Sequence, residues 1–300
     1  MTMDILTASE RIVNVYSHCG VSVHVEPMNG PDIYELVMPS EREGKADFLP
    51  PMLSPTKKLA TALMMAEALA DLHGYAGGAI GHFDIQMGQY LLDEDHRIKL
   101  SDFNRAEPLD WAEAEQEYCK VWMGGGSGNV RSPEEYHERV PIDYNVDVYS
   151  YGNILFTLLT GKEPYGDDIG NAKGLCGKGI TPPVDLAIRG QSFAEASLAT
   201  IMDKCFEFYP DKRIDIFTVI SLLRDAVHLN NKLESIEVTH FEVEEEGEEE
   251  GEEELLHYYY ENDDVDEDDN EGIKSDYGPK ENYDTHDPDA NNEDREEKMR

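Results

Sequence analysis

The sequence predicts an α+β fold with a small N-terminal β-sheet, a mainly helical body and a disordered acidic tail. Two β-rich runs come before residue 40, and helical patterns dominate from residue 59 to residue 229. Residues 241–300 hold 27 acidic and 5 basic side chains, which repel one another and leave little apolar surface to bury. We therefore expect a folded domain over residues 1–232 and a disordered tail over residues 233–300.

The N-terminal sheet is predicted from two apolar runs, residues 12–25 and residues 33–38. Between them lies Pro27-Met28-Asn29-Gly30-Pro31, a segment rich in residues that favour turns. This pattern predicts two antiparallel strands.

The helical body is predicted from several longer runs. Residues 59–73 place leucine and alanine on one helical stripe, which indicates a buried helix. Residues 146–160 are almost continuously apolar and stop at Gly161, as expected of a core helix. Further helices are predicted over residues 193–206 and 214–229.

A hairpin is predicted between the first two helices. Residues 90–92 and 97–100 are short hydrophobic runs joined by Asp93-Glu94-Asp95-His96. Residues 104–130 follow as a long irregular segment that includes several glycines.

The charge of the chain limits its function. A net charge of −39 argues against a nucleic-acid-binding protein, which needs a basic face, and favours basic protein partners. The most apolar stretch, residues 154–159, is far shorter than the roughly 20 residues that cross a bilayer. Because the start also lacks the pattern of a secretory signal, we expect an intracellular protein, cytoplasmic or nuclear, with no membrane partner. The four cysteines are scattered and lack zinc-site spacing.

Two carboxylates lie at the ends of the predicted hairpin, where they could face one cleft. His82-Phe83-Asp84 precedes the hairpin and Asp102-Phe103-Asn104 follows it. At these positions the sequence resembles the protein kinase family, which has His-Arg-Asp and Asp-Phe-Gly there.

Three further motifs extend the resemblance over about residues 12–229. Ser132-Pro133-Glu134 is similar to the family's Ala-Pro-Glu, residues 147–152 to the start of its buried central helix, and residues 210–213 to its late Pro-x-x-Arg. The resemblance implies a remnant N-lobe and hinge over residues 1–40 and a C-lobe over residues 41–232. It also implies a buried ion pair between Glu134 and Arg213, and a role for Asp147 in holding the backbone of the catalytic loop.

The resemblance further implies a nucleotide site that uses ATP and Mg²⁺ if the chain is active. Asp84 is the candidate base that accepts the proton of the substrate hydroxyl. Asp102 and Gln89 are the candidate metal ligands, although Gln89 replaces the usual Asn and is longer by one methylene group. Met38, at the expected hinge, and Leu91, on the expected adenine floor, are the candidate nucleotide contacts.

The sequence departs from the family at positions that carry charge. Gln86 replaces the Lys that faces the transferring phosphate, and Phe83 replaces the Arg that pairs with a phosphorylated activation segment. No glycine-rich loop and no strand Lys with a helix Glu partner precede residue 40. We therefore expect a pseudokinase, meaning a catalytically impaired kinase, that acts as a binding or scaffolding module.

Two alternatives stay open. The chain could transfer the γ-phosphate of ATP to a protein hydroxyl with an altered site, because Asp84 and Asp102 survive. It could also be the truncated form of a longer active kinase. The run after Gly161, which includes Thr181-Pro182-Pro183 and Cys205-Phe206 before Pro210, resembles tyrosine-kinase-like enzymes more than other kinases.

Overall fold

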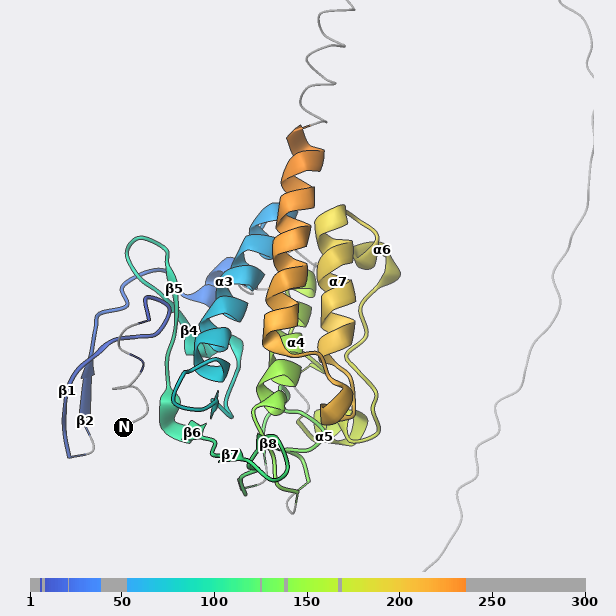
Figure 1. The fold of residues 1–300 in the computed structure, drawn as a ribbon. Coiled ribbons are helices and arrows are strands. Elements are labelled where there is room, and N and C mark those ends of the chain that lie inside the picture. The colour runs from blue at the N-terminus through green and yellow to red at the C-terminus, as the bar shows by residue number, and fades with distance from the viewer. Residues whose placement is uncertain are drawn as a thin grey trace, which may run out of the picture. The chain divides into compact units, whose positions relative to one another are not determined.

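The computed structural model describes residues 6, 9–20, 22–38, 53–124, 126–137, 140–166 and 169–235. Helices α3 (Pro55–His73), α4 (Asn145–Thr160), α7 (Phe193–Cys205) and a last helix over residues 216–235 lie side by side as a helical body (Figure 1). The predicted fold, mainly helical with a small N-terminal sheet, is confirmed. Residues 233–235 still belong to the last helix, and the remainder of the predicted tail lies outside the described residues.

Helix α4 is the centre of the body. Its residues from Val146 to Thr160 are all buried, as its mainly apolar sequence predicted. The helix ends at Gly161, whose φ of 66° is left-handed and is readily adopted by glycine. At Gly152 an added Cβ would lie 2.9 Å from the ring of Phe206, so the absence of a side chain lets α4 approach the end of α7 closely.

Helices α3 and α7 pack on α4 and are joined by a buried ion pair. Lys58 Nζ lies 2.5 Å from Glu195 Oε1 and also donates to the carbonyl of Leu159, 3.4 Å away. Each helix begins at a serine whose hydroxyl accepts a backbone hydrogen bond, Ser54 for α3 and Ser192 for α7. The predicted helices over residues 59–73 and 193–206 are confirmed, and α3 begins four residues earlier than predicted, at Pro55 after the cap of Ser54.

Short elements surround the helical body. The predicted hairpin is confirmed as the antiparallel pair β4 (Tyr90–Leu92) and β5 (Ile98–Leu100). The segment predicted as irregular contains β6 (Glu107–Pro108), which pairs with β3 (Ile80–Gly81), and a hairpin of β7 (Trp111–Ala112) and β8 (Glu117–Tyr118). The remaining elements are α5 (Ile169–Cys176), α6 (Leu186–Arg189) and the 3-10 helices η1 (Met87–Gln89), η2 (Phe103–Arg105) and η3 (Pro210–Lys212).

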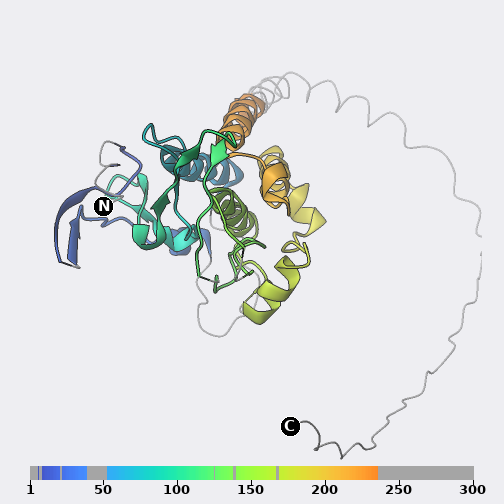
Figure 2. The same cartoon turned by 60° about the horizontal axis from the view of Figure 1, so that its bottom comes forward.

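The N-terminal strands differ from the prediction. Both β1 (Val15–Cys19) and β2 (Ser22–Val25) come from the first apolar run, which turns back near Gly20 (φ 59°), and their hairpin lies beside the helical body (Figure 2). The second run forms a helix, α2 (Ile33–Val37), so the prediction of a strand over residues 33–38 is wrong. Asp32 caps this helix by accepting a hydrogen bond from Tyr34 N, and the buried Ile33 and Val37 are spaced to share one helical face.

The position of Met38 also differs from the prediction. It lies at the C-terminal cap of α2, and not on a strand that enters a hinge. The connection between the β1–β2 hairpin and the helical part is instead the segment of residues 26–32, which precedes α2. Gly30 N in this segment donates to Leu92 O at 2.9 Å, and an added Cβ at Gly30 would lie 2.4 Å from Asp93 O. The assignment of Met38 to the hinge is therefore wrong.

The N-terminal hairpin is tied to strand β5 by main-chain hydrogen bonds. Val13 N donates to Leu100 O at 3.0 Å, and Leu100 N donates to Arg11 O at 2.8 Å. In the described part of the chain, no helix combines the length and apolar character that crossing a membrane requires.

Candidate functional site

The loop after strand β3 carries the candidate base, and helix α4 fixes its backbone. Asp147 Oδ2 accepts from His82 N at 2.7 Å, and Asp147 Oδ1 accepts from Phe83 N at 2.8 Å. These bonds hold Phe83 at a φ of 60°, a left-handed conformation that a bulky residue rarely adopts. The predicted role of Asp147 is confirmed.

His82 joins this loop to the residues that follow β5. Its Nε2 lies 3.0 Å from the carbonyl of Ser101, and its ring packs on Phe103 at a centroid distance of 5.0 Å. Burial lowers the pKa of His82, so the ring is neutral and donates from Nε2 to that carbonyl. His82 is therefore a buried packing residue that links the two loops.

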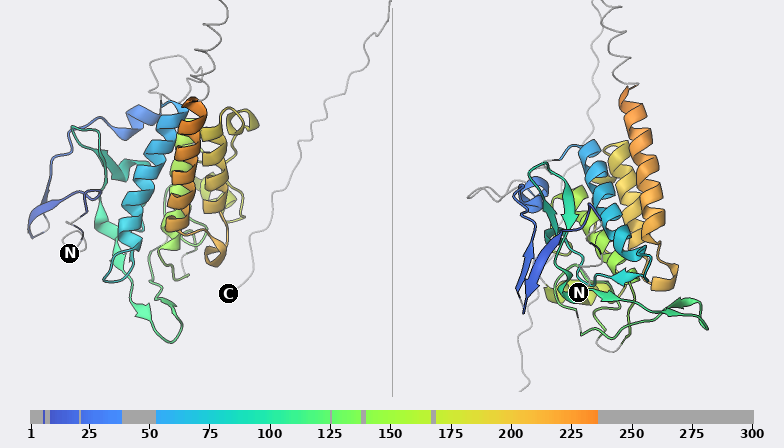
Figure 3. Two further views of the ribbon diagram at one scale, coloured as in Figure 1. Left: turned by 45° about the horizontal axis from the view of Figure 1, so that its top comes forward. Right: turned by 60° about the vertical axis from the view of Figure 1, so that its left-hand side comes forward.

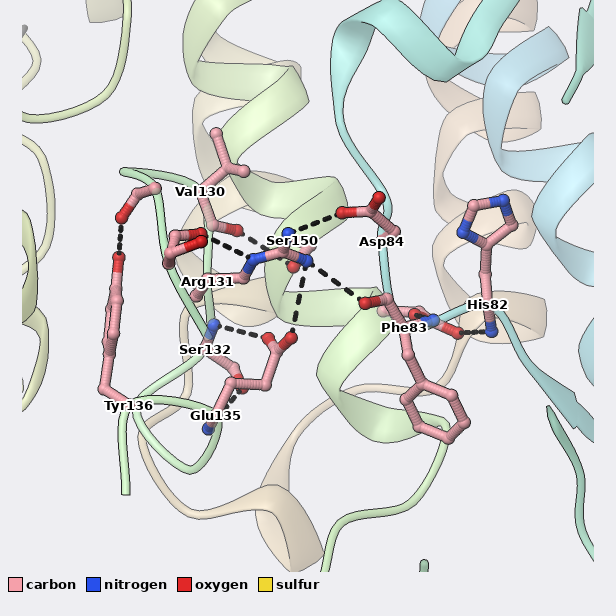
Figure 4. Close-up of polar contacts among 12 residues, drawn as sticks. His82, Phe83, Asp84, Val130, Arg131, Ser132, Glu135, Tyr136 and Ser150 are labelled. Atoms are coloured by element: carbon pink, nitrogen blue, oxygen red, sulfur yellow. Dashed lines mark hydrogen bonds and ion pairs between the residues drawn. The ribbon is translucent and has the colours of Figure 1, made fainter. Parts of the chain in front are cut away.

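Asp84 has partners at both of its carboxylate oxygens. Arg131 Nη2 lies 2.5 Å from Asp84 Oδ1, and Gln89 Nε2 donates to Asp84 Oδ2 at 3.3 Å. Figure 4 shows the Arg131 guanidinium reaching Asp84 from the segment that leads to Ser132. The side chains of Arg131 and Asp84 are only 8% and 16% exposed, so little water screens this ion pair.

Arg131 is held from several sides. Its Nη1 donates to Phe83 O at 3.1 Å, and its Nε donates to Ser127 O at 3.0 Å. The same Nη1 lies 3.6 Å from Glu135 Oε1, so one guanidinium lies between two carboxylates (Figure 4). Burial raises the pKa of Glu135 to about 7, although Arg131 opposes this rise.

The sequence did not reveal Arg131 as a site residue. Arg131 lies 47 positions after Asp84 in the sequence. Its position directly before Ser132-Pro133-Glu134 is the only sequence feature that could have indicated a role in the site. The fold brings it to Asp84 because Ser150 and Asn153 of α4 both donate to the carbonyl of Val130, which fixes the preceding residue.

The two candidate metal ligands lie on neighbouring segments, because Ser101 N and Ser101 Oγ donate to Gln89 O at 2.8 and 2.9 Å. Asp102 is exposed, with a left-handed backbone at φ 57°. Gln89 is buried, with its amide turned to Asp84. Among the residues that the structure describes, no group of three or more His, Cys, Asp or Glu could hold a metal ion. Mg²⁺ is usually bound by one or two protein oxygens together with phosphate oxygens and water, so the roles of Asp102 and Gln89 as metal ligands stay predictions.

The expected adenine floor lies next to a charged pair. Leu91 of β4 pairs in register with Lys99 of β5, so both side chains are on the same face of the hairpin. Lys99 Nζ lies 2.7 Å from Glu26 Oε1, in the segment that precedes α2. Burial opposes ionisation of Glu26, but hydrogen bonds from Lys99 and Asn14 N leave its pKa below the usual value. The role of Leu91 as an adenine contact stays a prediction.

The predicted ion pair between Glu134 and Arg213 is confirmed. Arg213 Nη1 lies 2.6 Å from Glu134 Oε1, and Nη2 lies 3.2 Å from Oε2. The same guanidinium donates to the carbonyls of Asn145 and Glu207 at 2.8 and 2.9 Å. This pair fastens the Ser132-Pro133-Glu134 segment to the loop before the last helix.

Comparison with known proteins identifies the type of domain to which these residues belong. A family model described as the protein kinase domain matches residues 10–222. The match includes the loop of Asp84, the segment of Arg131 and the pair of Glu134 and Arg213.

Curated relatives from Arabidopsis thaliana are named as receptor kinases or receptor-like kinases. Wall-associated receptor kinase-like 11 is 30% identical over 175 residues, which are 58% of this chain and 20% of that protein. Receptor-like protein kinase BRI1-like 3 is 29% identical over 188 residues, covering 59% of this chain and 16% of that protein.

A third relative is named "Probably inactive leucine-rich repeat receptor-like protein kinase". It is 31% identical over 169 residues, which are 55% of this chain and 20% of that protein. This chain therefore spans a fifth or less of the length of these relatives.

Proposed function

Because the chain belongs to the protein kinase family, we propose that it is a pseudokinase that acts as a protein-binding or scaffolding module. The observation that carries this proposal is the buried ion pair between Asp84 and Arg131. A base must lie within hydrogen-bond reach of the proton that it accepts. In Asp84, Oδ1 is taken by a guanidinium and Oδ2 by the amide of Gln89.

The charges near Asp84 support the same proposal. Phosphoryl transfer depends on cations that stabilise the phosphate oxygens in the transition state. Gln86 provides no charge where the family has Lys. Arg131 cannot serve as its replacement in this arrangement, because its donors already bind Asp84, Phe83 O and Ser127 O. Gln89 replaces the family's Asn and its amide donates to Asp84, so we derive no catalytic step through ATP or the metal.

The name of one relative, which includes "Probably inactive", also supports an impaired member of the family. For a binding module, the charge of −39 favours basic protein partners, and we propose an intracellular location for the chain. The run at Thr181-Pro182-Pro183 is the basis for proposing the tyrosine-kinase-like group.

A second candidate function is a protein kinase with a rearranged site. The retention of both Asp84 and Asp102 favours it, because these two carboxylates match the base and one metal ligand of the family. In that case Arg131 would have to leave Asp84 before a substrate hydroxyl could approach.

The test is a phosphate-transfer assay on the purified chain of 300 residues. We expect little or no labelled phosphate to pass from Mg·ATP to generic protein substrates, and only a slight rise of the melting temperature with ATP. The matched control is Asp84→Asn. Transfer by the parent that Asp84→Asn abolishes would overturn the pseudokinase proposal and establish the second candidate.

A further inference from the structure

A cavity of about 360 Å³ lies between the β7–β8 hairpin, the start of α4 and η3. Both views of Figure 3 show the hairpin standing out from the end of the helical body. The lining of this pocket includes three aromatic and three acidic residues: Trp111, Tyr118, Tyr144, Glu117, Asp143 and Asp211. The volume is near the lower limit of small-molecule sites, which suits one or two side chains.

The aromatic residues form a continuous wall. The rings of Trp111 and Tyr118 meet edge to face at 5.0 Å, and those of Tyr118 and Tyr144 do so at 5.6 Å. These contacts fix the positions of the rings. Trp111 nevertheless stays 45% exposed, so part of its indole is available to a ligand.

The polar part of the lining carries an excess of negative charge. The lining contains three acids, Glu117, Asp143 and Asp211, and one lysine, Lys120. Lys120 Nζ lies 3.9 Å from Asp143 Oδ2. That distance is at the limit of an ion pair, and Lys120 is 42% exposed, so it neutralises Asp143 weakly. Lys212 does not add to the pocket lining, and its Nζ lies 4.8 Å from the ring centre of Tyr209.

We propose that this pocket binds an arginine side chain from a basic segment of a protein partner. A guanidinium can stack on indole and phenol rings and at the same time donate hydrogen bonds to carboxylates. The aromatic wall of the pocket provides the rings, and its three acidic residues provide the carboxylates. Residues 241–300 of the same chain hold 27 acidic and 5 basic side chains, so their net negative charge disfavours their docking in this pocket. A second copy, also at −39, would be repelled. The inference rests on the proposed binding function and specifies where the partner docks.

The chain contains two tryptophans, which allows a direct test on the full-length protein. In Trp122→Phe, Trp111 is the only indole, and it reports on the pocket. In Trp111→Phe, the reporter is Trp122, which is 70% exposed and does not line the pocket. Each variant is titrated with acetyl-Gly-Arg-Gly-amide and with its citrulline analogue, which is similar in shape but uncharged, at about 0.15 M salt.

We expect a saturable change in Trp111 emission with the arginine peptide and at least about tenfold weaker binding of the citrulline peptide. Adding Glu117→Gln and Asp211→Asn to Trp122→Phe should weaken arginine binding by about tenfold. The control pair Glu113→Gln and Glu115→Gln removes equal charge from the same hairpin outside the lining and should change binding less than twofold.

Equal responses to both peptides would refute the proposal, since the pocket would then not select a cation. An equal effect of the two charge-removing pairs would refute it as well, because the attraction would come from the general acidity of the protein. If the emission of Trp122 in Trp111→Phe changes as much as the emission of Trp111 in Trp122→Phe, the proposal is also refuted, because the peptide would then not bind specifically at the pocket. None of these results depends on phosphate transfer, so failure of the pocket and failure of the pseudokinase proposal are distinguishable.

Discussion

Replacing Arg213 by alanine should severely destabilise the folded domain. The Arg213 side chain is fully buried, and its guanidinium pairs with both oxygens of Glu134 and with backbone carbonyls, including those of Asn145 and Glu207. Arg213→Ala removes all of these partners at once and leaves the carboxylate of Glu134 buried without its cation.

Breaking a buried ion pair from one side costs about 3 to 5 kcal/mol of unfolding free energy. For a domain of this size each kcal/mol lowers the melting temperature by roughly 2 to 4 °C, so we expect a fall of roughly 6 to 20 °C. Thermal unfolding followed by circular dichroism measures this fall. Because typical domains are stable by only about 5 to 15 kcal/mol, poor solubility of the variant would also agree with the expectation.

The matched control is Arg189→Ala. Arg189 also makes two hydrogen bonds to one carboxylate, that of Asp203, at 2.7 and 2.9 Å, but these side chains are 28% and 51% exposed. A surface pair of this kind contributes about 0 to 1 kcal/mol. If Arg213→Ala and Arg189→Ala melt at the same temperature, the reasoning from burial is refuted.

Three other predictions concern the core and the tail. The pKa of Glu135 is raised from 4.5 to about 7, so its protonated form stabilises the fold fully below pH 4.5 and this stabilisation is lost as the pH rises through 7. Glutamine cannot ionise, so Glu135→Gln should gain up to about 3 kcal/mol of unfolding free energy over the parent as the pH rises from 5 to 8. Urea unfolding of both proteins across this pH range measures the difference. Gly152→Ala should cost about 1 to 3 kcal/mol because its Cβ would meet Phe206, whereas Gly174→Ala, with open space around it in α5, should be neutral or stabilising; equal melting temperatures would contradict this. Removing residues 244–300 should change the melting temperature by only a few degrees, and loss of the cooperative transition would show that this segment is needed for the fold.

The sequence predicted the parts of the fold that depend on repeated local patterns. Helices α3, α4 and α7 have long apolar faces, and the β4–β5 hairpin has two short strands around a polar turn. The roles of Asp147 and of Glu134 with Arg213 were also predicted, because their motifs keep the order and spacing of a known family.

Short elements were harder to predict. Helix α2 has five residues, and its apolar positions fit a strand as well as a helix until the cap at Asp32 is taken into account. The ion pair between Arg131 and Asp84 was missed for a different reason. It joins residues 47 positions apart, and the direction of an arginine side chain depends on how two loops pack against α4. No local pattern encodes that direction.

In the proposed pseudokinase, Arg131 withdraws Asp84 from catalysis by a buried ion pair. A double-mutant cycle of Asp84→Asn and Arg131→Gln, read from urea unfolding of the two single variants, the double variant and the parent, tests it most directly. We predict a coupling free energy of about 1 to 3 kcal/mol, because both side chains are mostly buried and lie 2.5 Å apart. A coupling below about 0.5 kcal/mol, the range found for independent sites, would contradict the claim.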